Sequence, residues 1–374
     1  MAFFVYLWDS FSEKDSNIWY KERNKCLAKR AKKRYNKTVK SFAPVIGQKG
    51  CNMKLSVLAN LYGGKSLDEA LSILSSLGVK SVELGAGGYP GKAHCDPAAL
   101  LADPAALKEF RATLAKYDIE ICALAAHGNP VHPNAEIAAR FDRDFCDAVL
   151  LAEQLGVDTV ITFSGCPGDS ETSQYPNWVT CPWPDDFLKI LNWQWNEKLI
   201  PYWKKTADFA KAHGVNRIAF EMHPGFCVYN PETLLRLREA VGDVIGANLD
   251  PSHLFWQGID PVAAVKALKG AIYHVHAKDT KIDEQNTAVN GVLDTKHYGK
   301  ELERSWIFRT VGYGHGESFW RDFVSTLRLC GYDRVLSIEH EDSVMTVDEG
   351  LRKAVAFLQP VLIEEKKPGQ MSWA

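Results

Sequence analysis

The sequence lacks several patterns that would place it in a common class at once. Its nine cysteines include no CxxC pair, whereas disulfide frameworks and zinc ribbons both need closely spaced cysteines. We therefore expect reduced thiols and a cytoplasmic protein. No run approaches the roughly 18–20 continuous apolar residues of a membrane-spanning helix, so contact with a membrane is not expected either.

Features of nucleotide and nucleic-acid binding are also missing. The glycine-rich loop at residues 85–91 follows an apolar run but lacks the GxGxxG spacing of dinucleotide-binding folds. Residues 1–52 hold 12 Lys and Arg against 4 Asp and Glu, a balance of +8. The whole chain carries −2, which leaves −10 on residues 53–374. An acidic body is a poor ligand for phosphate backbones, so we expect no nucleic-acid partner.

Two regions follow from this composition. Residues 1–52 carry a basic cluster between Lys29 and Lys40 and no sustained amphipathic period. We interpret them as an N-terminal extension, either disordered or an artefact of the chosen start, in preference to a targeting or nucleic-acid-binding arm. Residues 53–374 are expected to form a single domain, because a regular pattern begins at Met53.

From Met53 onward, short apolar runs alternate with longer segments of helical period, which is typical of βαβ units and a parallel sheet. Eight alternations predict an α/β fold of the (β/α)8 TIM barrel type, rather than an open doubly wound sheet. Long loops without regular period are expected after the fourth and seventh strands, at residues 165–184 and 278–315, over the mouth of the barrel. The expected strands cover residues 54–60, 80–84, 120–125, 159–163, 217–221, 244–249, 272–276 and 334–339. The expected helices cover residues 66–77, 97–117, 136–155, 185–213, 231–241, 261–268, 317–330 and 346–358.

Carboxylate and imidazole side chains end each of the last four expected strands. Side chains alternate across a strand, so the parity that turns Phe220 outward turns Glu221 inward. The same parity turns Asp250, His276 and Glu339 inward. Carboxylates gathered at one level are costly to bury as bare charges, and a divalent cation removes that cost. The sequence therefore predicts a metal site, with Mn²⁺ as first choice and Mg²⁺, Co²⁺ or Zn²⁺ as alternatives.

At these strand ends the chain resembles the sugar phosphate isomerase/epimerase family, the xylose isomerase-like TIM barrels. The resemblance covers roughly residues 53–360 and is carried by the segments VELGAGGYPG, AAHGNPVHP, FEMHPGF, NLDPSHLFWQGIDP, YHVHAKD and LSIEHED. It implies that the four converging residues bind the metal. It also implies that His253, three residues after Asp250, contacts the substrate or the metal.

Further side chains are expected to complete the pocket. Strand parity turns Glu83 inward, where it could bind a substrate hydroxyl or serve as an acid or base. His127 ends the third strand and is a second candidate for the pocket. Trp256 directly follows the loop that carries Asp250, and is expected to form a wall against which a sugar ring stacks. The predicted substrate-binding residues are Glu83, His127, His223, Trp256, His274 and Lys278.

The leading functional prediction is a metal-dependent isomerase or epimerase. Its substrate is a small sugar or a keto-glycoside, from which it removes a proton next to a ketone through an enediolate. The predicted catalytic residues are Glu221, Glu339 and His253, with the two carboxylates moving the proton. Either a homo-oligomer or a complex with a small partner subunit would be compatible with this prediction.

Three alternatives remain open from the sequence. In the first, the same carbanion of a keto-sugar expels an O- or C-linked aglycone or water, so the enzyme is a lyase or dehydratase with His253 or His223 as base. A remote alternative is an abasic-site-type endonuclease, suggested by the spacing of Asp250 and His253 and disfavoured by the acidic body. The last is a non-catalytic sugar-binding or scaffold protein.

Overall fold

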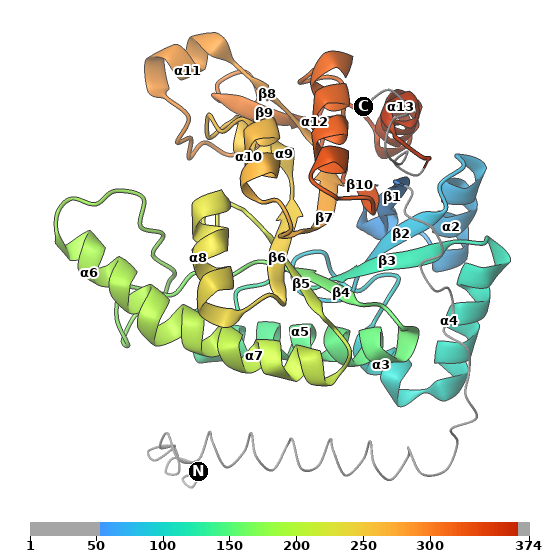
Figure 1. Cartoon of the computed structure of the whole chain (residues 1–374), viewed down its shortest axis with the longest axis horizontal. Helices are drawn as coiled ribbons and strands as arrows, with labels where there is room; N and C mark the ends of the chain where they lie inside the picture. The colour runs from blue at the N-terminus through green and yellow to red at the C-terminus, as the bar shows by residue number, and fades with distance from the viewer. Residues whose placement is uncertain (1–52, 366–374) are drawn as a thin grey trace, which may run out of the picture. The chain divides into compact units, whose positions relative to one another are not determined.

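The computed structural model describes residues 53–365, and its centre is a closed barrel of eight parallel strands (Figure 1). The hydrogen-bonded order around the barrel is β1-β10-β7-β6-β5-β4-β3-β2, and β1 pairs with β2 to close it. The predicted (β/α)8 barrel is therefore confirmed. The barrel strands are β1 (Lys54–Leu58), β2 (Ser81–Gly85), β3 (Glu120–Ala125), β4 (Thr159–Thr162), β5 (Arg217–Glu221), β6 (Ile245–Leu249), β7 (Ile272–Ala277) and β10 (Val335–Ile338). The predicted extension at residues 1–52 lies outside the described residues.

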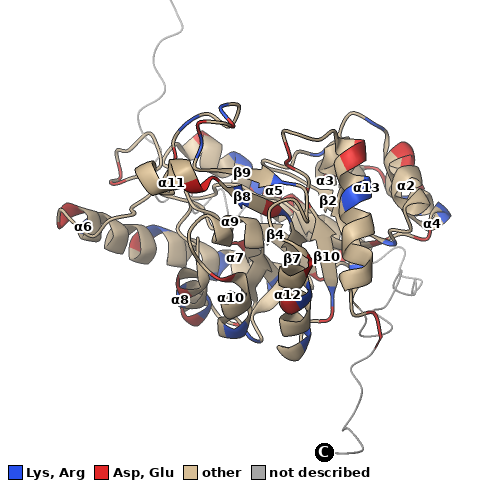
Figure 2. Cartoon of the chain, turned by 90° about the horizontal axis from the view of Figure 1, so that it is seen from above, with Lys and Arg blue, Asp and Glu red and all other residues tan. Residues whose placement is uncertain are grey.

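Helices follow the strands and cover the outside of the barrel (Figure 1). Acidic and basic residues are interspersed along these outer helices (Figure 2). The helices packed around the barrel are α2 (Leu67–Ser76), α3 (Pro97–Ala102), α4 (Pro104–Lys116), α5 (Ala135–Leu155), α6 (Asp186–Trp193), α7 (Ile200–Ala212), α8 (Pro231–Val241), α10 (Pro261–Ala267), α12 (Glu317–Leu329) and α13 (Val347–Leu358). Shorter turns are η1 (Ala59–Tyr62), the π-helical η2 (Gln194–Leu199), α9 (Pro251–Phe255), α11 (Glu284–Asn290) and η3 (Gln359–Val361).

The strand positions predicted from the sequence are confirmed, but two helices differ from the prediction. The segment expected as one helix at residues 97–117 is divided into α3 and α4, because Asp103 caps α4 and Pro104 opens it. Proline cannot continue the preceding helix, and it restricts the residue before it to extended backbone. The segment expected at residues 185–213 contains the π-helical turn η2, which changes the register between α6 and α7.

The segment after the seventh barrel strand is more regular than predicted. We expected no regular structure in residues 278–315, yet β8 (Asp279–Ile282) and β9 (Trp306–Arg309) pair as an antiparallel ribbon, with α11 between them. This expectation was wrong because strands of four residues are too short to show a clear alternation of polar and apolar side chains. The long loop after β4 is confirmed, since α6 does not begin until Asp186.

The predicted alternation of inward and outward side chains is confirmed by the packing. Phe220 is buried in the outer core between barrel and helices, where its ring meets Trp203 of α7 edge-on at 4.6 Å. Its neighbour Ala219 faces the barrel interior, where it packs with Ala123 and Ile161. Full burial of a large apolar side chain such as Phe220 stabilises the folded state by about 1.5–3 kcal/mol. Small apolar residues thus fill part of the barrel interior and leave the mouth to polar side chains.

Candidate metal centre

Four ligand-type side chains meet at the carboxyl ends of consecutive barrel strands. Glu221 ends β5, Asp250 follows β6, His276 lies in β7 and Glu339 follows β10. One ligand atom of each lies within 4.8 Å of the other three. The structure therefore brings together all four residues that the sequence predicted as metal ligands.

Strand register explains this meeting. Asn248 of β6 pairs with Glu221 of β5, so Asp250, two residues later, points inward one level higher. On the other side, Ser337 of β10 pairs with His276 of β7, which again places Glu339 two residues further along the inner face. Because parallel strands end at the same edge, side chains with matching parity converge at the mouth.

Glu221 is the most densely hydrogen-bonded of the four. Its Oε1 accepts from His253 Nε2 at 3.0 Å, and its Oε2 accepts from His127 Nε2 at 3.0 Å and from Asn248 Nδ2 at 3.1 Å. Burial opposes its ionisation, but the bonds from His127 and His253 outweigh burial and hold the pKa of Glu221 well below its usual range. The carboxylate is therefore charged at neutral pH.

Lys278 brings a buried ammonium group into the same cluster. Its Nζ lies 2.8 Å from Glu339 Oε2, 3.1 Å from Asp250 Oδ2 and 3.0 Å from Glu341 Oε2, and the side chain is 2% exposed. Burial disfavours the charge on Lys278, but Asp250 and Glu339 raise its pKa well above the usual value. Burial also opposes the ionisation of Glu339. Lys278 and His276 outweigh this effect and lower the pKa of Glu339 to about 2.

The donor set fits a divalent cation. Three carboxylates and one imidazole offer oxygen and nitrogen ligands of the kind used by Mn²⁺, Mg²⁺, Co²⁺ and Zn²⁺. Asp250 supports the fit, because its Oδ1 accepts from the Ser252 N–H at 2.8 Å while its buried Oδ2 accepts no hydrogen bond. Lys278 Nζ lies 3.1 Å and His253 Nε2 3.4 Å from that oxygen.

Three histidines surround the carboxylates. His127 and His253 each direct Nε2 to Glu221, and in both rings the buried Nδ1 has no hydrogen-bond partner. The His223 ring is centred 4.1 Å from that of His253. Its Nδ1 donates to the Pro224 carbonyl, so its lone pair is on Nε2. Burial, and then the neighbouring His253, lower the pKa of His223 to about 3, which keeps this ring neutral.

Aromatic rings flank the centre on two sides. On one side Phe163 and Phe226 stack with centroids 4.3 Å apart, and Phe163 contacts the His127 ring at 4.6 Å. On the other side the ribbon of β8 and β9 supplies Phe308, whose ring is 5.3 Å from that of His253. Lys278 Nζ lies 4.7 Å from the centre of the Phe308 ring.

The remaining predicted substrate-binding residues are buried. Trp256 is buried and stacks on Trp306 with centroids 4.5 Å apart, and its indole N–H has no partner. Glu83 and His274 are fully enclosed and bonded to each other at 2.9 Å. Site residues that the sequence did not single out are Asn248, Phe163, Phe226 and Glu341. Of these, Asn248 carried a signal, since its inward parity equals that of Asp250.

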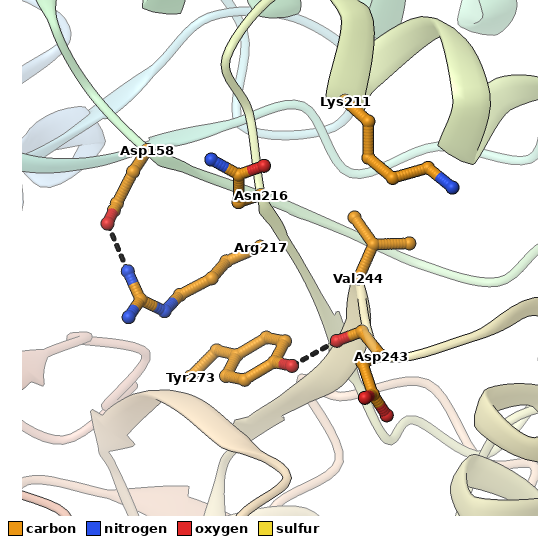
Figure 3. Close-up of a pocket in the computed structure, with 7 residues that line it drawn as sticks. All are labelled: Asp158, Lys211, Asn216, Arg217, Asp243, Val244 and Tyr273. Carbon is orange, nitrogen blue, oxygen red and sulfur yellow. Dashed lines mark hydrogen bonds and ion pairs between the residues drawn. The ribbon is translucent and has the colours of Figure 1, made fainter.

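A surface hollow of about 480 Å³ lies at the opposite end of the strands (Figure 3). Its lining includes Arg217, which begins β5, and Tyr273, near the start of β7. Arg217 is paired with Asp158, and the Tyr273 hydroxyl donates to the Asp243 carbonyl (Figure 3). Because its polar groups bond to one another and lie away from the carboxylate cluster, this hollow is not the metal centre.

Comparison with known proteins agrees with this geometry. The family model described as xylose isomerase-like TIM barrel matches residues 71–361. The uncharacterized protein YfiH of Bacillus subtilis (strain 168) is 40% identical over 313 residues, which cover 83% of this chain and 99% of YfiH. None of the helices between residues 53 and 365 is long and apolar enough to cross a membrane.

Solved structures share the fold at low sequence identity. The IolI protein, in a crystal structure with a bound zinc atom, superposes with a TM-score of 0.57 at 19% identity, covering 83% of this chain and 98% of IolI. D-psicose 3-epimerase, in a crystal structure with D-fructose, gives a TM-score of 0.54 at 14% identity, covering 83% of this chain and 99% of the epimerase.

Proposed function

Since the chain belongs to the xylose isomerase-like TIM barrel family, we propose that it is a divalent-metal-dependent isomerase or epimerase of a sugar-like substrate. The observation that carries the proposal is the convergence of Glu221, Asp250, His276 and Glu339 within 4.8 Å. Zinc in IolI and the epimerase activity named for the second structure support it. Mn²⁺ is the preferred ion, because hard carboxylate oxygens dominate the donor set.

The ion would be held by these four side chains. When bound, a divalent cation polarises a carbonyl oxygen and a neighbouring hydroxyl, which acidifies the C–H bond between them. The chain's own groups must then bind the substrate, exclude water and move the proton.

Glu339 is the proposed base for removing the proton. Of the four side chains it is the most exposed, at 14% against 4% for Glu221 and none for Asp250 and His276. Its contacts with Lys278 and His276 are both made by Oε2. The proposal therefore assigns proton transfer to Oε1.

Glu221 and His253 are the proposed partners that return the proton on the other side. Both Glu221 oxygens already accept hydrogen bonds from imidazoles, so a proton passes to the substrate through a ring rather than directly. His253 suits this role because its Nδ1, which has no partner in the protein, could carry the proton to be returned, while Glu221 at Nε2 would stabilise the doubly protonated ring. His127 has the same arrangement and is the proposed ligand of a substrate hydroxyl.

The substrate is proposed to be a neutral sugar or cyclic polyol ketone. Lys278 is paired with Glu339, Asp250 and Glu341, so it does not offer a free charge to a phosphate. The Phe163–Phe226 stack and the Phe308 ring present apolar faces of the kind on which sugar C–H groups pack.

A second candidate is elimination from a keto-sugar, giving a lyase or dehydratase. The specific observation in its favour is the aromatic cluster of Trp256, Trp306 and Phe308 beside His253. Such a wall suits a substrate with an apolar leaving group. His253 is the better-placed base for this reaction, because its ring lies 5.3 Å from that of Phe308 and its Nδ1 has no hydrogen-bond partner.

One assay separates the two reactions. Purified protein with Mn²⁺ is incubated in D₂O with free ketohexoses, cyclic polyol ketones and 3-keto-glycosides, and followed by proton NMR. Deuterium beside the carbonyl of a product with an intact carbon skeleton is expected for the isomerase or epimerase. Release of an aglycone or water without such a product would replace that function by the lyase. No reaction with any compound in the panel would contradict both.

A further inference from the structure

His276 presents its two ring nitrogens to two different groups of carboxylates. Nδ1 lies 3.3 Å from Glu221 Oε2 and 3.1 Å from Glu339 Oε2, within the candidate metal centre. Nε2 lies 3.1 Å from Oε2 of Glu83. The His276 side chain is fully enclosed, so its surroundings in the protein decide which nitrogen carries the proton.

The Glu83 carboxylate accepts hydrogen bonds from two other strands of the barrel. It accepts hydrogen bonds from His274 Nε2 at 2.9 Å, from Ser337 Oγ at 2.8 Å and from His276 Nε2. These partners belong to β7 and β10, while Glu83 itself lies in β2, so the network ties the barrel together across its interior. A carboxylate with 0% exposure and three donors is poorly placed to bind a substrate hydroxyl, and needs another role.

Glu83, His274 and His276 also form a group with metal-ligand chemistry, since one ligand atom of each lies within 4.8 Å of the others. The bonded atoms in this group are, however, as close as 2.9 to 3.2 Å, which is the range of ordinary N–H···O hydrogen bonds. Atoms held tetrahedrally on one ion at about 2.0–2.1 Å would lie about 3.3 Å apart. Hydrogen bonds alone can therefore hold this group together, and no second ion is needed to explain it.

We propose that Glu83 is a positioning residue, which accepts the Nε2 proton of His276 and so directs the Nδ1 lone pair into the metal centre. The inference rests on the proposed metal-dependent function. A carboxylate behind a histidine ligand fixes the tautomer and raises the basicity of the ring, and its removal weakens metal binding about 10–100-fold. Glu83, His274 and His276 are then joined by hydrogen bonds and not by an ion. The chain accordingly binds one divalent ion at the mouth of the barrel.

The test is metal affinity rather than activity alone. Glu83→Gln keeps the volume and one acceptor oxygen but removes the charge, and the full-length variant is titrated with Mn²⁺ or Zn²⁺ beside wild type. The dissociation constant is expected to rise about 10–100-fold, while circular dichroism of the metal-free proteins stays the same. The matched control is Ser337→Ala, which removes a different donor from Glu83 and leaves the His276 bond in place. It is expected to change the affinity much less.

A second measurement reports the tautomer directly. In zinc-loaded protein with ¹⁵N-labelled histidine, we expect His276 to carry its proton on Nε2 and the metal on Nδ1. Metal on Nε2 would overturn the inference, and so would two equivalents of tightly bound ion per chain. If Glu83→Gln does not fold, Glu83→Asp retains the charge but shortens the side chain away from His276. The same weakening is expected, and unchanged affinity would count against the proposal.

The two proposals fail in different ways. If the wild-type chain binds no divalent ion, the metal-dependent function is wrong and the role of Glu83 falls with it. If wild type binds one ion and Glu83→Gln binds it equally tightly, only the role of Glu83 is wrong.

Discussion

Lys278 and Glu339 form a buried ion pair at the mouth of the barrel, with Nζ 2.8 Å from Oε2. Lys278 also touches Asp250, so the same ammonium contacts two of the four proposed metal ligands. It balances part of the negative charge that the ligands bring together. A divalent ion at this place would neutralise the same carboxylates, and the two cations are therefore linked in their effect on stability.

Replacing Lys278 by Met tests this link. Breaking a buried pair by removing one partner leaves an uncompensated charge and costs about 3–5 kcal/mol. The metal-free variant should thus melt at a lower temperature than wild type, and Mn²⁺ should raise its Tm by more than it raises that of wild type. Differential scanning fluorimetry with and without Mn²⁺ measures both. Lys300→Met is the control, because its pair with Glu303 is exposed and contributes at most about 1 kcal/mol.

Replacing Glu339 by Gln tests the proposed base. The amide cannot take a proton, so kcat should fall by at least about 100-fold, the lower range for loss of a general base. The fold should persist, as judged by circular dichroism. Glu341→Gln is the matched control, since it removes another carboxylate partner of Lys278 that is 48% exposed. If Glu339→Gln retains near-normal turnover, Glu339 is not the base.

A pair of glycine variants tests how closely the loop after β2 is fitted to His127. Gly88 has φ +64°, and a Cβ there would lie 1.7 Å from the His127 carbonyl oxygen. Gly88→Ala should displace His127 from Glu221 and lower kcat/KM. Gly78 has φ +78° with nothing within 4 Å of its Cβ position, so Gly78→Ala should cost only the backbone strain of about 1–2 kcal/mol. Equal activity in the two variants would contradict the close fit.

Asp342 predicts a pH dependence of stability. Its carboxylate accepts from the Thr310 and Val344 N–H groups, both at 2.8 Å. Burial opposes its ionisation, but the backbone bonds from Thr310 and Val344 outweigh burial and lower its pKa. A group with a depressed folded pKa stabilises the fold fully above its unfolded value of about 3.9, and that stabilisation is lost as the pH falls through the folded pKa.

The variant Asp342→Asn measures this contribution. At neutral pH its free energy of unfolding in urea should be lower than that of wild type. Between about pH 4 and pH 2 the difference should shrink, because protonation removes the charge of the wild-type carboxyl as well. A difference that stays constant over that range would show that the effect of Asp342 is not ionic.

The barrel and the inward face of its strands could be predicted from the sequence, because both depend on local patterns. Phe220 and Glu221 are adjacent, and once one is buried against a helix the other must point inward. The height of a side chain along the barrel axis could not be predicted in this way. Glu83 was correctly turned inward, but its place beneath His276 depends on the stagger of β2 relative to β7, which no local pattern encodes.

Contacts between segments that are distant in the chain could not be predicted from the sequence either. Glu341 and Phe308 reach Lys278 from the loop after β10 and from the ribbon, and neither segment carries a motif that points to the other. The division of α3 from α4 was different, since Asp103 followed by Pro104 is a readable helix start. The helical period did not reveal this break between α3 and α4, because apolar residues continue on both sides of it.

The proposed metal ligands and the aromatic residues beside them come from different segments of the chain. The proposed ligands sit at the ends of barrel strands, whereas Phe308 and Trp306 come from a segment inserted between β7 and α12. A change in the length or sequence of the ribbon would reshape one wall of the pocket and leave the ligand-bearing strand ends in register. Relatives of this chain could thus acquire new substrates by replacing a single insertion, while the proposed ligands keep their places at the strand ends.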